Sequence, residues 1–297
     1  HAAGNRMTRE LAFIERLRAL ATHPAARGLR DDCAVLDLGA ETLILTHDML
    51  VEGIHYLPDA DRADVAWELV ATNLSDLAAK GAEPLGVLLG HMLGPDDADF
   101  LRGLEEVLGH YNVPLLGGDT TSGGPPRADG LTAIGRATFR PVPSRSGARP
   151  GDAIYLTGPL GGAMLGFEAL RDGTGEDSTA YRRPRARLTE GQALAPHVTA
   201  MMDVSDGLLL DAARMARASG VTMALDAASV PLACPPARLS AAMRWGDDYE
   251  LLFTAPAETA LPVPVFRVGT VLEQADTPLL LDGVPLSEKD GLGYEHG

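Results

Sequence analysis

The residues of this chain that point most directly to chemistry are aspartates placed where apolar runs begin or end. Asp32 precedes the apolar run 34–38, Asp48 follows the run 42–46, and the others lie in short polar motifs. The candidates are Asp32, Asp48, Asp76, Asp119, Asp203 and Asp206. A single aspartate in such a place usually caps a helix or closes a turn. Because strand ends line the ligand crevice of α/β folds, this many aspartates together predict one shared site.

Carboxylates that converge on one crevice repel one another unless a cation neutralises them. Mg²⁺ suits such a site, because it binds through a few carboxylates, waters and substrate phosphates. The chain carries 25 Lys and Arg against 41 Asp and Glu, a formal net charge of −16. This balance argues against nucleic acid or an anionic membrane as the main partner. A phosphorylated ligand would therefore need a metal ion to attract it.

Two glycines, Gly117 and Gly118, directly precede Asp119 and would let backbone amides approach phosphate oxygens closely. A tight turn explains the pair equally well. The phosphate loop G-x-x-x-x-G-K-[ST] is absent, because the two lysines, Lys80 and Lys289, lie elsewhere. The protein-kinase motifs, the G-x-S-x-G elbow and the H-E-x-x-H motif are also missing. The sequence thus excludes an ordinary nucleotide kinase and these hydrolase classes.

Cysteine content and apolar patterning indicate a cytoplasmic protein. Cys33 and Cys234 are the only cysteines, so a disulfide framework is excluded. No apolar run approaches the roughly 20 residues of a membrane span, so we expect no membrane partner. The residues ahead of Met7 look like a cloning remnant rather than a signal peptide, since no apolar core follows them.

The elements that must position these residues alternate along the chain between apolar runs and helical spacing. The expected strands are 34–38, 42–46, 85–92, 113–116, 131–139, 153–157, 221–225, 249–254, 265–268 and 278–281. The expected helices are 11–20, 64–79, 97–110, 162–171, 188–194, 207–219 and 236–244. The polar stretch 172–187 is expected to be an exposed loop. Hairpin-like and crossover connections are mixed in this order, which predicts an α/β (mixed α+β) fold with a mixed sheet.

A break in the pattern falls at residues 140–152, where three prolines and two glycines occur in thirteen residues. Such a composition is typical of a linker. We therefore expect two domains, an N-terminal domain at 7–140 and a C-terminal α/β domain at 153–297, joined by a linker at 141–152.

Seven motifs follow one another in the order found in the thiamine-monophosphate kinase family. They are Gly28–Ala34, Thr46–His55, Asn73–Ala82, Gly117–Thr121, Ser144–Asp152, Asp203–Leu208 and Gly246–Leu251. The resemblance covers nearly the whole chain and extends more distantly to aminoimidazole ribonucleotide synthetase and its relatives. It implies ATP-dependent phosphorylation of thiamine monophosphate to thiamine diphosphate, assisted by several Mg²⁺ ions. It also implies that the N-terminal domain, 7–140, binds ATP and Mg²⁺ and forms a homodimer in which the N-terminal sheets make a β-barrel spanning both chains. The C-terminal domain would be an α/β sandwich.

The resemblance assigns a role to each residue that matches a family motif. The metal ligands would be Asp32, Thr46, His47, Asp48, Asp76, Asp119, Asp203 and Asp206. ATP would be bound by Gly117, Gly118, Asp119, Arg145, Ser205 and Tyr111. Thiamine monophosphate would be bound by His55, Asp247 and Tyr294. Asp119 and Arg145 would be the catalytic residues.

The chemistry fits these residue types. The nucleophile would be a phosphate oxygen, largely ionised at neutral pH because its second pKa is about 6, so no general base is needed. The difficulty is to bring two polyanions together, and metal ions with one arginine achieve this by neutralising charge. A site rich in aspartate and poor in lysine can therefore transfer a phosphoryl group in line.

Three residues depart from the family pattern. Arg30 stands where a glycine is usual, His47 replaces a threonine, and Asp247 replaces a glutamate. Two alternatives stay open on this ground. One is a related enzyme that phosphorylates another small acceptor, and the other is a protein that binds nucleotide or metal without catalysis.

Overall fold

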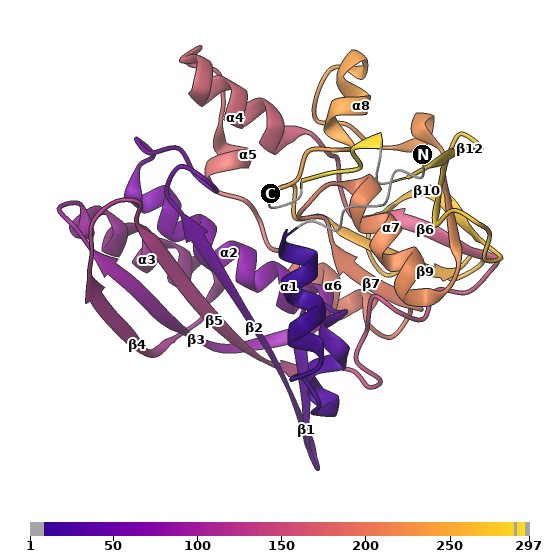
Figure 1. Ribbon diagram of the computed structural model, residues 1–297, viewed down its shortest axis with the longest axis horizontal. Helices are drawn as coiled ribbons and strands as arrows, with labels where there is room; N and C mark the ends of the chain where they lie inside the picture. The colour runs from indigo at the N-terminus through magenta and orange to yellow at the C-terminus, as the bar shows by residue number, and fades with distance from the viewer. Residues whose placement is uncertain (1–8, 288–289, 295–297) are drawn as a thin grey trace.

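The computed structural model describes residues 9–287 and 290–294 and contains two mixed β-sheets joined by the segment 138–151 (Figure 1). Helices pack against each sheet, so the fold is mixed α+β, as the sequence predicted. Whether the domain limits 7–140, 141–152 and 153–297 are correct stays a prediction. Within the described ranges, no helix is long and apolar enough to cross a membrane.

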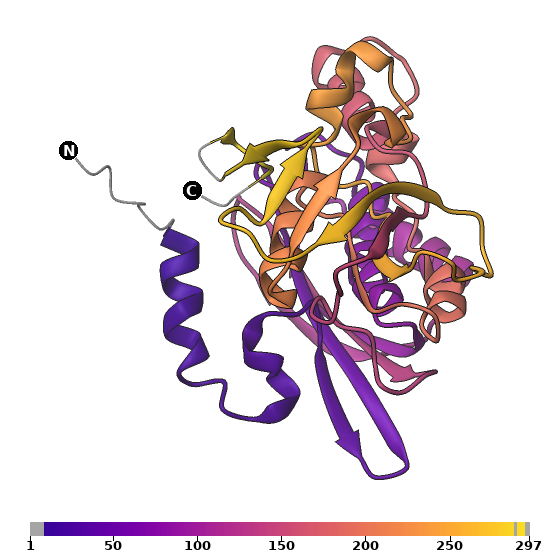
Figure 2. The ribbon, with the colours of Figure 1, turned by 90° about the vertical axis from the view of Figure 1, so that its right-hand side faces the viewer.

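The first sheet is built by the N-terminal half of the chain. Its elements are α1 (Arg9–Arg18), η1 (Pro24–Leu29), β1 (Ala34–Leu38), β2 (Glu41–Val51), α2 (Arg62–Ala79), β3 (Ala82–Leu93), α3 (Asp97–Tyr111), β4 (Leu115–Ser122) and β5 (Ala128–Ala137). The strand order is β1-β2-β5-β3-β4, with β3 and β4 parallel and the other pairs antiparallel. The sheet is open, with β1 and β4 as its edges. Figure 2 shows α1 standing apart from the body of the molecule.

Helices α2 and α3 cover only one face of the first sheet. Along β2, buried and more exposed residues alternate, which is the pattern of a strand with one covered face. Ile44 and Leu131 are fully buried on that face. On the other face Met49 and Leu88 stay exposed, at 50% and 39% of their surface. The β-barrel implied by the family is therefore not closed by the described part of this chain, which supplies a half-covered sheet.

The second sheet is built by the C-terminal half. Its strands are β6 (Asp152–Leu156), β7 (Ala200–Asp203), β8 (Thr222–Leu225), β9 (Leu251–Pro256), β10 (Phe266–Leu272), β11 (Leu279–Leu281) and β12 (Val284–Leu286). Its helices are α4 (Gly162–Asp172), α5 (Thr179–Arg182), α6 (Leu188–Leu194), α7 (Leu208–Ser219), η2 (Ala227–Ser229), η3 (Pro236–Arg238) and α8 (Leu239–Ala242). The order is β12-β11-β8-β10-β6-β9-β7, and only β8 and β11 pair in parallel. Every residue of β6 and β7 is buried, so both faces of this sheet are covered.

Helix α2 is buried almost all round and lies between the two halves. It starts at the N-cap Asp61, whose side chain accepts a hydrogen bond from the Ala63 amide. It stops before Gly81, whose φ of +59° is readily adopted by glycine, as the sequence predicted. Its C-terminal end packs closely against α6 of the second half. A Cβ atom at Gly191 of α6 would lie 2.0 Å from the Ala78 carbonyl oxygen, so this close approach requires glycine.

Three expectations about elements were wrong. Strand β7 was missed, because four residues ahead of a polar motif are too short to show a period. The stretch 172–187 is not simply an exposed loop, since it holds α5 and the buried Tyr181. The strand expected at 113–116 lies at Leu115–Ser122 instead, where it includes Gly117-Gly118 and is exposed throughout.

Candidate active site

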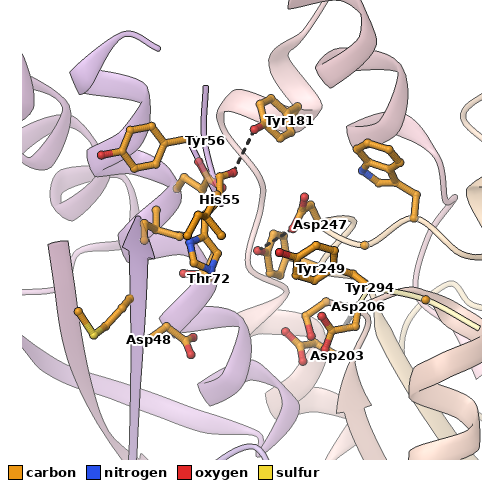
Figure 3. Close-up of a pocket in the computed structure, with 18 of the residues that line it drawn as sticks. Asp48, His55, Tyr56, Thr72, Tyr181, Asp203, Asp206, Asp247, Tyr249 and Tyr294 are labelled. Atoms are coloured by element: carbon orange, nitrogen blue, oxygen red, sulfur yellow. Dashed lines mark hydrogen bonds between the residues drawn. The ribbon is translucent and has the colours of Figure 1, made fainter. Parts of the chain in front are cut away.

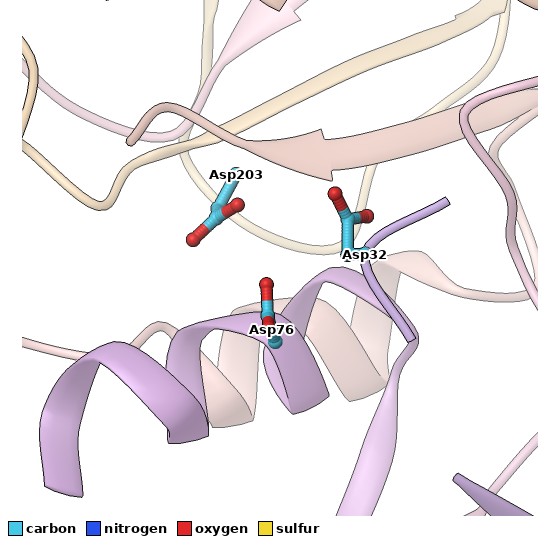
Figure 4. Close-up of side chains that lie close together, drawn as sticks. All are labelled: Asp32, Asp76 and Asp203. Atoms are coloured by element: carbon cyan, nitrogen blue, oxygen red, sulfur yellow. The ribbon is translucent and has the colours of Figure 1, made fainter. Parts of the chain in front are cut away.

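Three of the predicted aspartates meet where the two halves of the chain face each other (Figure 4). One carboxylate oxygen from each of Asp32, Asp76 and Asp203 lies within 4.8 Å of the other two. Asp32 comes from the segment before β1, Asp76 from α2, and Asp203 from the end of β7. Three elements distant in sequence therefore build one carboxylate cluster, as expected from aspartates at strand and helix ends.

Two basic side chains already touch this cluster. Lys80 is fully buried, with Nζ 2.5 Å from Asp31 Oδ1 and in contact with Asp32 Oδ2. Arg145 holds the other Asp32 oxygen, with Nη2 to Oδ1 at 2.5 Å. Burial alone would raise the pKa of Asp31, but Lys80 and Arg27 hold that pKa well below its usual value. Asp31 is therefore ionised at neutral pH.

The other two carboxyls of the cluster behave differently. Burial raises the pKa of Asp76 well above its usual range, and the nearby charges of Asp48 and Asp203 add to the shift. Burial followed by Asp32 raises the pKa of Asp203 to about 7. Carboxyls that resist ionisation because of burial and of one another are the kind of group that a divalent cation stabilises.

The donor set of the cluster fits Mg²⁺. It consists of oxygens only, and Asp32 Oδ2 is buried without a hydrogen bond of good geometry. The Thr46 hydroxyl donates a hydrogen bond to the Asp76 carboxylate. Asp48 lies two residues after Thr46 on β2, so both side chains point to the same face of the sheet. Hard oxygen ligands with room for phosphate are typical of magnesium rather than of zinc or copper. Cys33 lies close by, but its thiol is buried and its pKa is raised well above the usual value, chiefly by burial.

The cluster opens into a cavity of about 1050 Å³ between the two halves (Figure 3). Asp48 and Thr72 line it from the first half, and Asp247, Tyr249 and Tyr294 line it from the second. Ser205, Asp206 and His55 also line the cavity. The structure therefore brings the predicted thiamine-phosphate residues to the same cavity as the aspartates, with aromatic side chains around them.

Hydrogen bonds fix the cavity wall. His55 Nδ1 accepts from the Val51 amide at 2.9 Å, which closes the turn after β2. The Tyr181 hydroxyl donates to the His55 carbonyl at 3.1 Å, a contact between the two halves that Figure 3 shows as a dashed line. Tyr249 Oη donates to Asp247 Oδ1 at 3.4 Å.

Asp247 and Tyr249 both have left-handed backbone, with φ of +62° and +50°. Such values are uncommon outside glycine and cost of order 1–3 kcal/mol, so surrounding contacts must hold them. The Asp247 amide donates to the Ser205 carbonyl and the Tyr249 amide to the Val204 carbonyl, both at 2.9 Å. The segment thereby points both side chains at the cavity.

Several predicted residues lie elsewhere. Asp119 is exposed on the edge strand β4, in register with Gly90 and Gly130 and so with Met49 of β2. Three strand spacings of about 4.8 Å separate β4 from β2, roughly 14 Å. Within this chain, Asp119 therefore does not lie beside the cluster.

Gly117, Gly118, Tyr111 and His47 also lie outside the cluster. The two glycines share the exposed strand β4 with Asp119. The Tyr111 hydroxyl, at the end of α3, accepts from the Ala186 amide at 2.9 Å. The His47 ring bonds Thr132 of β5 at 2.9 Å, so its side chain is engaged across the sheet, while His47 also lines the cavity next to Asp48.

Sequence reasoning missed Lys80, Glu68, Tyr181 and Tyr249 as residues of this region. Lys80 was used only to exclude a phosphate loop. Its spacing of four residues from Asp76 places it one helical turn away, which was the available signal. Tyr249 lies in the motif Gly246–Leu251, but no role was assigned to it. Glu68 and Tyr181 carried no signal, because one lies in an amphipathic helix and the other in a stretch expected to be a loop.

Comparison with known proteins decides the family. The models "AIR synthase related protein, N-terminal domain" and "AIR synthase related protein, C-terminal domain" match residues 30–137 and 149–273. The thiamine-monophosphate kinase of Salmonella typhimurium is 36% identical over 299 residues, which cover 91% of either chain. This chain belongs to the thiamine-monophosphate kinase family. It is thus a kinase enzyme, as the motifs predicted.

Solved kinases of this family have the same fold. The structure described as AaThiL complexed with AMPPCP and TMP superposes with a TM-score of 0.85 at 26% identity, covering 94% of both chains. The kinase from Stenotrophomonas maltophilia K279a gives 0.75 at 32% identity, covering 93% of this chain and 96% of its own. The kinase of Caulobacter vibrioides is 35% identical over 92% of this chain and 86% of its own length.

Proposed function

We propose that this kinase transfers the γ-phosphoryl group of ATP to thiamine monophosphate and so forms thiamine diphosphate. The observation that carries the proposal is the single cavity that joins the carboxylate cluster to an aromatic-lined end. The cluster end suits metal-bound phosphates, and the aromatic end suits a cationic heteroaromatic ring. The solved relative described with AMPPCP and TMP supports both ligands.

We further propose that Asp32, Asp76 and Asp203 hold Mg²⁺ together with Asp48, Asp206 and the oxygens of Thr46. Bound Mg²⁺ would neutralise the phosphate charges and leave the acceptor phosphate free to attack in line. The chain's own contribution is to hold these carboxylates in place at the cavity between its two halves. The acceptor oxygen is already ionised, so no side chain has to remove a proton.

Arg145 is positioned to act with this cluster. Its Nε donates to Asp32 Oδ1 at 2.6 Å, and its carbonyl accepts from Ser219 Oγ of α7 at 3.1 Å. The segment 138–151 is thereby tied to both halves. We propose that Arg145 contacts ATP phosphates from this position, with Ser205 nearby on the cavity wall.

The exposed edge of the first sheet supports a homodimer. Leu88 and Met49 on its open face, with Leu115 and Leu116 on β4, form an apolar surface of a kind that usually marks an interface. A second copy placed against this face would complete a barrel and would cover β4, which carries Gly117, Gly118 and Asp119. We propose that these three residues, and Tyr111, contribute to ATP and metal binding only in that dimer.

The setting we propose is the cytoplasm. Cys33 and Cys234 are both buried and unpaired, which agrees with a reducing compartment.

The test is an assay of thiamine diphosphate formation from Mg-ATP and thiamine monophosphate, with thiamine and other small phosphates as rival acceptors. We expect thiamine monophosphate to be the acceptor and chelator to abolish both ATP binding and turnover. Asp119→Asn should lower turnover by about 100-fold or more, since one metal ligand is lost. Phosphorylation of thiamine itself, abolished by His47→Thr, would overturn the assignment. ATP binding without any turnover would instead indicate a non-catalytic relative.

A further inference from the structure

Glu68 is a buried carboxyl that faces the cavity. It lies on α2, is only 5% exposed and lines the same cavity as the carboxylate cluster. No residue in the described part of the chain forms a hydrogen bond or an ion pair with its carboxyl group. Leaving a buried polar group without a partner costs about 1–3 kcal/mol. Such a group is therefore expected to find its partner in a ligand.

Among the residues that the structure describes, the charges that act on Glu68 are negative and so do not offset this cost. Burial raises the pKa of Glu68 well above its usual value, and the charges of Asp247 and Asp64 raise it further. Tyr181 and Asp247 line the cavity together with Glu68, and after burial the charges of Glu68 and Asp247 raise the pKa of the Tyr181 hydroxyl, so this end of the cavity is acidic. A ligand at this end must supply hydrogen-bond donors or positive charge.

Position along α2 indicates which part of the ligand reaches Glu68. Glu68, Thr72 and Asp76 are four residues apart, so they share one face of the helix, and all three line the cavity. Asp76 belongs to the carboxylate cluster, and Glu68 lies two turns away, about 12 Å along the helix axis. In thiamine monophosphate the phosphate is followed by the thiazolium ring and then by the aminopyrimidine. With the phosphate at Asp76, the aminopyrimidine falls beside Glu68.

We infer that Glu68 is a specificity-determining residue that accepts a hydrogen bond from the exocyclic amino group of the substrate's aminopyrimidine. The inference rests on the proposed function and extends it to the ring that takes no part in the phosphoryl transfer. It assigns Glu68 to recognition alone, so the ATP site and the transfer step should not depend on it.

The test compares two acceptors that differ at one group, thiamine monophosphate and its analogue with an oxo group in place of the 4′-amino group. The comparison is made at a pH high enough to ionise Glu68, where the unaltered enzyme should prefer the amino substrate by about 100-fold or more in kcat/KM, because a carboxylate has no donor for the oxo group. In Glu68→Gln the carboxamide can donate to the oxo group, so the ratio should fall to within about fivefold. The KM for ATP should stay unchanged.

Asp64→Asn is the matched control. Asp64 is also buried on α2, one turn before Glu68, but its carboxyl group is bonded to Arg182 and Arg183 and is not among the residues lining the cavity. The Asp64→Asn variant should show the same kcat/KM ratio between the two acceptors as the unaltered enzyme. A second variant, Glu68→Leu, removes both acceptor oxygens and should bring the ratio close to one.

The outcomes distinguish a failure of the Glu68 inference from a failure of the proposed kinase function. No turnover of thiamine monophosphate by the unaltered enzyme overturns the proposed function and the inference with it. Turnover with an unchanged ratio in both Glu68 variants overturns the inference alone. Equal loss for both acceptors in Glu68→Gln also overturns it, because the carboxyl group would then act on the thiazolium charge that both acceptors share.

Discussion

The two sheets of this kinase differ in how completely one chain covers them. The C-terminal sheet is buried on both faces, and every residue of β6 and β7 is buried. The N-terminal sheet is covered on one face only, and every residue of its edge strand β4 is exposed. The C-terminal sheet is thus completed within the chain, whereas the N-terminal sheet presents an edge and an apolar face that another surface can cover.

This difference reaches the active site. Asp203 ends a strand of the covered sheet and lies in its place in the carboxylate cluster. Asp119 lies on the uncovered edge, away from that cluster, although the family motif assigns it the same role. Asp203 is thus positioned within one chain, whereas Asp119 lies on a strand edge that a second chain can cover.

The largest effect should come from the covered sheet. Phe253 is fully buried on β9 and stacks on Tyr155 with ring centroids 5.2 Å apart. Phe253→Ala should lower the free energy of unfolding by about 4 kcal/mol, since it leaves a cavity in a dense core. Leu116→Ala on the exposed edge is the control and should cost less than about 1 kcal/mol in the monomer. Urea titrations at low protein concentration measure both, and equal losses would contradict the contrast between the sheets.

A slightly smaller effect is expected where the two halves are tied together. Lys80 contacts Asp31 and Asp32, and its Nζ donates to the Met201 carbonyl of β7 at 3.2 Å. Lys80→Met leaves buried carboxylates with less compensation and should cost about 3 kcal/mol when measured in chelator.

Arg136→Met serves as the control for the lysine variant, because Arg136 pairs with Glu83 on the exposed surface of the first sheet. We expect no measurable change in its unfolding midpoint. A Lys80→Met protein as stable as the unaltered one would show that the buried ion pairs do not join the halves.

The open face can be tested through the dimer. Leu88→Glu places a charge on that face and should raise the dimer dissociation constant by about 100-fold, or roughly 2.7 kcal/mol. Light scattering against concentration measures it. Leu101→Glu, at a side chain 61% exposed on α3, should leave the dimer intact. An unaltered protein that is monomeric at micromolar concentration would reject the dimer itself.

The smallest effect, counted per pH unit, concerns a buried carboxyl group of the covered half. Burial raises the pKa of Asp248 to about 7, although its carboxylate accepts hydrogen bonds from the Gly161 and Ala163 amides. The folded state therefore binds this proton more tightly than the unfolded state, whose carboxyl has a pKa of about 3.9. Its contribution to stability is complete below about pH 4 and is lost as the pH rises to about 7, with a slope of up to about 1.4 kcal/mol per pH unit.

Asp248→Asn removes that proton and should flatten the fall in stability between about pH 4 and pH 7 relative to the unaltered protein. Denaturant titrations at several pH values in chelator measure the difference. Parallel curves for the two proteins would show that Asp248 does not titrate in this range.

Most of the fold could be predicted because the signals were local. Helix α2 carried an apolar period and a glycine stop, and the fold class followed from the mixed order of strands and helices. Strand β7 could not be predicted, because its burial comes from neighbours on both sides rather than from its own pattern. The position of β4 was wrong for a related reason, since Gly117 and Gly118 are poor strand formers that pairing with β3 overrides.

The site was predictable to the extent that it follows from aspartates at element ends. Asp32, Asp76 and Asp203 meet as expected from such placement. Lys80 and Glu68 were not predictable as site residues, because their roles depend on which face of α2 meets the other half of the chain. Which face of α2 packs against the other half is set by tertiary structure and cannot be predicted from the helical period alone.

The burial of α2 has a consequence for how this protein can be divided. By sequence the helix belongs to the first half, yet Ala78 and Ala79 pack in one cluster with Leu194 and Phe253 of the second. A cut in the segment 138–151 would uncover this end of the helix and expose apolar surface on both fragments. The two halves are therefore not interchangeable modules. Grafting either onto a relative would require the α2 surface to be redesigned along with it.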